Sequence, residues 1–297
     1  MSCAAAEALR LLRCEAPCAL LHIFKLWVHA FNDEQAVLDF AAALPSHRGK
    51  IKAFNVSWVS LENGAMADAL MRCIAEARVS DVTFFQCKLA PASLPSLTRL
   101  LEACCPEKLS IFNSRSALFE AGPDLTTFCH TLHSSTLKEL TLDTCDIWRD
   151  SPAAGELLAA LMGHPTLQEL SLQFDRVVNT NYAQRAAGEQ LASLIAHTNA
   201  LQKLSMVFNN LGEAGLVPMF EALSRSRTLK ELLYYVMYEE SISREFARDV
   251  ILPAVCLNTS LRKLGFGLSG ETLPELAEAH AIVAARTQPD AGVAAAV

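Results

Sequence analysis

The stretch ALQKLSMVFNNLGEAG, from Ala200 to Gly215, decides the fold of this chain. Leu201, Leu204 and Met206 are apolar at intervals that fit neither the period of a helix nor a simple alternating strand. The polar residue Asn209 follows them, and glycines come soon after. This order predicts a short strand that ends in a sharp turn.

The same pattern recurs along the chain. It appears upstream in TLKELTLDTCDI, from Thr136, and in TLQELSLQFDRV, from Thr166. It appears downstream in TLKELLYYVMYE, from Thr228, and in SLRKLGFGLSGE, from Ser260. With looser copies near the N-terminus, the first apolar positions are residues 21, 51, 79, 106, 137, 167, 201, 229 and 261. A regular step of about 30 residues is typical of a repeat array.

Between the strand-like runs, apolar residues recur at helical spacing. The clearest sets are Ala154, Leu157, Leu158 and Leu161; Ala187, Leu191, Leu194 and Ile195; and Leu216, Met219, Phe220 and Leu223. Small polar residues stand at one shared position after the strands, and we expect them to bond backbone groups left free at the turn. They are Cys87, Cys145, Asp175 and Asn209.

The run L-x-x-L-x-L-x-x-N/C-x-L, as in Leu201 to Leu211 and Leu137 to Ile147, resembles the leucine-rich repeat. Units of this length with a full helix resemble the ribonuclease-inhibitor type. That resemblance implies an α/β solenoid of about nine repeats, a curved horseshoe with a parallel sheet on its concave face and helices on its convex face. We expect residues 1–20 to form a capping segment with a helix, 21–286 the array, and 287–297 a flexible tail.

Composition limits the class of protein. The chain has 297 residues, of which 52% are hydrophobic and 19% charged, so it can fill an extended core. Its net charge of -7 argues against nucleic-acid binding. No apolar run approaches the length of a membrane span and no signal peptide is evident, which predicts a cytoplasmic protein.

Motifs for catalysis, metals and cofactors are absent from the sequence, so we expect no enzyme, no cofactor, no metal and no small-molecule substrate. The clusters Cys14, Cys18 and His22, and Cys129, His130 and His133, lack the second pair of a zinc site. The histidines His133, His164 and His197 recur just before the first leucine of a repeat, where imidazole can bond the last carbonyls of a helix.

A partner protein or peptide is expected on the concave face, where strand side chains that point away from the core lie. Aromatic side chains are frequent anchors of interfaces, and acidic ones would attract a basic partner. For Phe85 and Phe112 the alternative is that they are core residues in a frame slipped by one. The candidates are Trp27, Phe85, Phe112, Glu139, Asp143, Trp148, Glu169, Tyr235 and Tyr238, with Asp146 beside them.

Three functions remain open from the sequence. The first is a non-enzymatic binding module, similar to bacterial host-directed effectors or to sensing arrays. The second is an activator of small GTPases, as some ribonuclease-inhibitor-type arrays are, acting through Arg115, Arg176 or Asn210. The third is a ubiquitin ligase that uses Cys145 beside Asp146 as its nucleophile.

Overall fold

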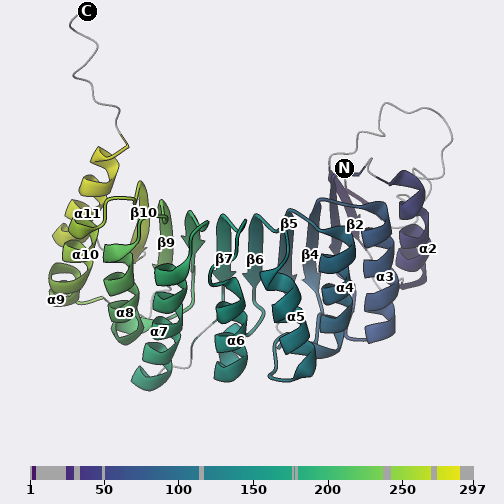
Figure 1. The fold of residues 1–297 in the computed structure, drawn as a ribbon, viewed down its shortest axis with the longest axis horizontal. Helices are drawn as coiled ribbons and strands as arrows, with labels where there is room; N and C mark the ends of the chain where they lie inside the picture. Colours follow the sequence, from purple (N-terminus) through teal and green to yellow (C-terminus); the bar gives the residue numbers. More distant parts are fainter. Residues whose placement is uncertain are drawn as a thin grey trace, which may run out of the picture. The chain divides into compact units, whose positions relative to one another are not determined.

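The computed structural model describes residues 2–4, 25–29, 34–48, 51–113, 117–175, 177, 180–236, 242–268 and 273–287. Contacts within the chain divide it into two compact units, Met1–Leu167 and Gln168–Val297. Each unit alternates parallel strands with helices, which is the solenoid-like α/β architecture expected from the repeats (Figure 1). The two units are described separately below.

The first unit carries a parallel sheet in which each strand pairs with the next along the chain. Its strands are β1 (Ser2–Ala4), β2 (Lys25–His29), β3 (Ala53–Ser57), β4 (Asp81–Cys87), β5 (Lys108–Asn113) and β6 (Glu139–Asp143). Its helices are α2 (Glu34–Ala43), α3 (Gly64–Ala77), α4 (Leu94–Cys104), α5 (Pro123–His133) and α6 (Ser151–Leu161), with 3-10 turns at Leu44–His47, Pro91–Ser93 and Ile147–Arg149.

The second unit repeats the arrangement, and its strands also pair in parallel and in chain order. The strands are β7 (Glu169–Gln173), β8 (Lys203–Ser205), β9 (Glu231–Val236) and β10 (Lys263–Leu268). The helices are α7 (Asn181–His197), α8 (Gly212–Arg225), α9 (Arg244–Phe246), which continues through a π-helical turn at Ala247–Ile251 into α10 (Leu252–Leu257), and α11 (Pro274–Ala285).

Alternation along β6 and β7 separates a core side from an open side. In β6, Leu140 and Leu142 are buried while Glu139, Thr141 and Asp143 stay partly exposed. The strand β7 shows the same alternation. We call the sheet face that carries the partly exposed residues the open face; the apolar stripes of the helices pack on the other.

The helices expected from apolar spacing are present and turn the expected residues inward. The three sets of apolar residues lie in α6, α7 and α8, and every member is buried. Each repeat thus completes its core with its neighbour, because one strand and one helix cannot cover their own apolar faces.

The polar position works as the sequence predicts in three copies. Asn209 Nδ2 donates to the Leu172 carbonyl oxygen at 2.7 Å. In two other copies, Cys87 Sγ lies 3.6 Å from the Val56 carbonyl and Cys145 Sγ 3.9 Å from the Ile111 carbonyl. In all three, the acceptor is the last core residue of the preceding strand, so one side chain ties each turn to the repeat before it.

The fourth copy keeps the expected frame as far as Phe112, but the end of its strand is one residue shorter than expected. The pairing of β4 with β5 shifts between Phe85 and Cys87, so that Cys87 lies opposite Asn113. Asn113 therefore takes the polar position, and its side-chain amide accepts from the Leu89 N–H at 2.9 Å and donates to the Leu89 carbonyl at 3.1 Å. Asn113 was not among the predicted polar residues, because copies of equal length would place Ser114 at this position.

The N-terminal copy also requires a correction. The expected frame placed Lys25 beside Asn55 and Trp27 beside Ser57, but β2 pairs Lys25 with Ala53 and Trp27 with Asn55. The frame was therefore wrong by two residues. Residues 2–4, expected in a capping helix, form β1 and pair with β2. Leu9 and Leu12 of that expected helix lie outside the described residues.

Candidate functional site

The middle of the open face is lined by small residues. In the first unit the strand register aligns Asn55, Thr83, Ser110 and Thr141, as the sequence predicts. In the second it aligns Ser171, Ser205, Leu233 and Gly265. Asn55, Ser110, Ser205 and Gly265 of this row are buried, so the small polar side chains that an extended segment of another chain could reach are those of Thr83, Thr141 and Ser171.

Next to this row, the first unit carries a pair of aromatic rings. The register aligns Ser57, Phe85, Phe112 and Asp143. The Phe85 and Phe112 rings lie 5.6 Å apart between centroids and are half-buried, whereas the preceding Phe84 is fully buried. The frame at these copies is therefore the expected one, and the two rings are on the open face rather than in the core.

Asp143 stands at the end of this aromatic row. Burial beside the rings raises the pKa of its carboxyl group, and a hydrogen bond from the Thr144 hydroxyl, 2.6 Å from Oδ1, lowers it in part. A carboxylate in this position is poorly solvated, so a donor on a bound chain would relieve part of that cost.

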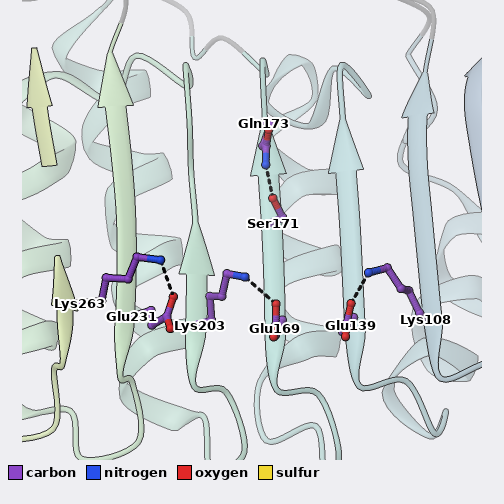
Figure 2. A network of polar contacts seen from close by, with 8 residues as sticks. All are labelled: Lys108, Glu139, Glu169, Ser171, Gln173, Lys203, Glu231 and Lys263. Atoms are coloured by element: carbon purple, nitrogen blue, oxygen red, sulfur yellow. Dashed lines mark hydrogen bonds and ion pairs between the residues drawn. The ribbon is translucent and has the colours of Figure 1, made fainter. Parts of the chain in front are cut away.

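The two glutamates expected to add negative charge are instead paired with lysines (Figure 2). In the first unit, Lys108 Nζ contacts Glu139 from the neighbouring strand. In the second, Lys203 Nζ lies 2.8 Å from Glu169 Oε2, and a similar pair joins Lys263 to Glu231 at 3.4 Å.

In the predicted acidic stretch of Glu139, Asp143, Asp146 and Glu169, the two glutamates are therefore neutralised by lysines, which is a correction. Asp146, also in that stretch, is exposed, with Arg149 Nη1 at 4.0 Å from its carboxylate. Only alignment of the first residue of each strand would have revealed the lysine partners, because they belong to adjacent copies.

Tyr235 is the predicted aromatic that the open face of the second unit displays most clearly. Its side chain is 42% exposed. It leans over β10, where a methyl group added at Gly265 would lie 2.5 Å from the Tyr235 hydroxyl and 2.6 Å from Leu233 Cδ2. The absence of a side chain at Gly265 thus allows Tyr235 and Leu233 to lie across the neighbouring strand.

Two further aromatics stand beyond the ends of β7 and β8 and were not predicted. Phe174 is 46% exposed, and its ring lies 4.7 Å from that of Phe208. The Phe208 N–H donates to the Tyr235 carbonyl at 2.7 Å, which places Phe208 beside the end of β9. Phe174, Phe208 and Tyr235 are called the aromatic cluster below.

The backbone explains why these rings point outward. Phe174 and Phe208 adopt left-handed conformations, with φ of 55° and 63°. Trp58, 47% exposed, has a φ of 62° at the same repeat position in the first unit. In the copies of Phe174 and Phe208, this position immediately precedes the polar residue of the turn. An aromatic residue at this position could therefore have predicted an exposed ring.

Of the three other predicted aromatics, the structure describes the side chain of Trp148. Trp148 lies in the 3-10 turn Ile147–Arg149 and is only 7% exposed, so its prediction as a surface anchor was wrong. The backbone of Trp27 lies in β2 and pairs with that of Asn55 in β3. Tyr238 lies outside the described residues.

Two of the residues named for the catalytic alternatives have buried side-chain atoms. Cys145 is fully buried, and its Sγ lies 3.4 Å from the Asp143 carbonyl, where no conjugating enzyme could reach it. The Asn210 side-chain oxygen is buried rather than projecting from its loop. Arg115 and Arg176, the other candidates for a GTPase activator, lie outside the described residues.

The histidine and cysteine clusters show no built metal centre within the described ranges. No three His, Cys, Asp or Glu side chains gather there in a way that could hold a metal ion. Cys129, His130 and His133 lie along α5, and His133 Nδ1 is 2.9 Å from the Ala160 carbonyl. Cys14, Cys18 and His22 are outside the described residues.

Comparisons with known proteins do not assign a family. No family model matches the chain, and no curated protein matches it. One matching solved structure is titled "Leiomodin-1 Actin-Binding Site 2 (ABS2)", with 16% identity over 46% of this chain and 73% of that chain, at a TM-score of 0.38. No helix among the described residues is long and apolar enough to cross a membrane.

Proposed function

We propose that this chain is a non-enzymatic protein-binding module of the cytoplasm, built as a ribonuclease-inhibitor-like leucine-rich-repeat horseshoe of about nine repeats. Its partner is an extended segment of another protein, held on the concave face. The observation that carries the proposal is the aromatic cluster of the second unit.

The aromatic cluster has the properties of an interface anchor. Phe174 is 46% exposed and Tyr235 is 42% exposed, so much of their apolar surface remains in contact with water. Exposed aromatic surface costs about 25 cal/mol per Å² relative to burial, so a group of such rings favours a partner that covers it. Aromatic side chains also bring large contact area with few rotatable bonds.

The neighbouring residues suit an extended peptide. The partly exposed Ser171 forms a low floor beside the cluster, and the Tyr235 hydroxyl offers a donor and an acceptor at its edge. An apolar side chain of the partner would pack on Phe174 and Phe208, while its backbone would bond the polar groups of the floor.

Affinity capture from a lysate of the source cells tests the proposal. The wild-type chain is compared with the double variant Phe174→Ala/Tyr235→Ala, after circular dichroism shows that both are folded. If the two rings are anchors worth at least ~2 kcal/mol together, the variant should bind the captured protein at least about 30-fold more weakly.

The matched control is Tyr182→Ala/Leu257→Ala. It also removes one tyrosine and one apolar side chain, which are 86% and 66% exposed on α7 and α10. The control should bind like wild type. Equal loss in both variants, or no loss in the cluster variant, would show that the cluster is not the binding surface.

A further inference from the structure

A second surface, on the helices of the first unit, carries charge of the opposite sign to the whole chain. A groove of about 970 Å³ runs along α3 and α4 and the end of the 3-10 turn Leu44–His47. Four arginines line it, namely Arg48, Arg72, Arg78 and Arg99. Asp68, Glu76 and Glu102 also line the groove, so the arginines outnumber the carboxylates by one in a chain whose net charge is -7.

The acidic residues in the groove do not neutralise all of these arginines. Arg99 Nη2 lies 2.5 Å from Asp68 Oδ1, which accounts for one pair. Glu102 Oε1 accepts a hydrogen bond from the Thr131 hydroxyl at 3.2 Å. Glu76 remains as the third carboxylate of the lining.

The other three arginines have their guanidinium groups available. Arg48, Arg72 and Arg78 are exposed and make no ion pair with any residue that the structure describes. Arg78 caps the carboxyl end of α3, where a positive charge favours the helix dipole. Arg72 stands more than one turn earlier, beyond the reach of that effect, so the dipole does not account for it.

We propose that this groove binds an acidic segment of a protein, whose carboxylates pair with Arg72 and Arg78. A guanidinium group presents two parallel N–H donors that match a carboxylate. Pro45, Ala75 and Ala103 supply small apolar walls against which the aliphatic stems of glutamate side chains can pack. This surface is separate from the open face of the sheet and does not depend on the function proposed for it.

The mixture of charges in the groove favours a peptide over a nucleic acid. A continuous polyphosphate would meet Glu76 and Glu102 as well as the arginines, and it would lose affinity at each carboxylate. A peptide can place its acidic residues at the arginines and neutral residues opposite the two glutamates.

Fluorescence anisotropy with a short labelled oligoglutamate peptide tests the proposal on the full chain. The variant Arg72→Gln/Arg78→Gln should weaken binding at least about fivefold, and added salt should weaken the binding of wild type. Arg48→Gln, at the end of the 3-10 turn Leu44–His47, should weaken it by a smaller factor. All three side chains are exposed, so circular dichroism should show unchanged folding.

The control Lys88→Gln/Arg149→Gln removes the same charge from exposed positions of the same unit outside the groove. It should bind the peptide like wild type. No binding of oligoglutamate to wild type, or an equal loss in both double variants, would overturn the proposal. So would tighter binding of a single-stranded oligonucleotide that the groove variant abolishes.

Discussion

The hydrogen bond that Asn209 makes across the repeat boundary predicts a measurable cost of removing it. Asn209 is fully buried, and its Nδ2 donates to the Leu172 carbonyl at 2.7 Å. Substitution of alanine leaves that carbonyl without its donor in a place that water does not reach. A buried polar group left unpaired costs about 1–3 kcal/mol, so Asn209→Ala should lower the free energy of unfolding by about that amount.

Cysteine at the same position should be tolerated better. Cys87 and Cys145 hold this position in other copies, with Sγ at 3.6 and 3.9 Å from the corresponding carbonyl. A thiol is a weak donor that still fills part of the space of the amide. Asn209→Cys should therefore cost less than Asn209→Ala.

Urea unfolding followed by circular dichroism measures these differences. Asn199→Ala is the matched control, because Asn199 is exposed and its loss should change stability by less than about 0.5 kcal/mol. A cost for Asn209→Ala no greater than that of Asn199→Ala would refute the reasoning. Equal costs for alanine and cysteine at position 209 would show that the bond to the carbonyl is not what stabilises the turn.

Three further predictions concern other positions. Burial lowers the pKa of His164 from 6.5, so its contribution to stability is fully present above pH 6.5 and is lost as the pH falls through the lower folded pKa. His164→Asn should make the free energy of unfolding depend less on pH, as measured by urea titrations at several pH values. Asparagine suits this position because Asn258 accepts a hydrogen bond from the Leu261 N–H, as His164 does from the Leu167 N–H. In Gly188→Ala the added methyl group would lie 2.0 Å from the Gly215 carbonyl oxygen, which would push α7 away from α8. The free energy of unfolding should fall by at least about 2 kcal/mol in the same urea assay. An unchanged unfolding midpoint would contradict the close contact between the two helices. Glu169→Gln breaks an exposed ion pair with Lys203 and should cost less than about 1 kcal/mol, with a difference from wild type that disappears in high salt.

The repeat period predicts the strands and helices well because every copy must bury the same stripe against its neighbour. The apolar sets of α6, α7 and α8 follow directly from their spacing. The rows of small residues on the open face also follow from alternation, once the copies are aligned.

The error at Trp27 has a simple physical origin. Phe24, Leu26 and Val28 are all apolar at alternate positions. A frame moved by two residues keeps every side chain on its own face of the sheet, so alternation alone cannot detect the slip. Only the pairing of β2 with β3 resolves it.

The repeat pattern does not predict the conformation of turn residues or the partners of side chains on neighbouring strands. The turn Ile147–Arg149 carries Trp148 into the interior, a local conformation that repeat spacing does not specify. The outward direction of Phe174 and Phe208 depends on a left-handed backbone at one turn position. The pairing of Glu139 with Lys108 depends on which residue of the neighbouring copy stands opposite.

The most direct test of the central claim is photocrosslinking from the aromatic cluster. A photoreactive phenylalanine analogue is placed at position 208, or at the exposed position of Leu257 on α10 as the control, and the chain is illuminated in a lysate of the source cells. We predict a discrete protein adduct from position 208 that is absent from position 257 and lost with Tyr235→Ala. Adducts of equal yield from both positions, or one from position 257 alone, would contradict binding on the open face of the sheet.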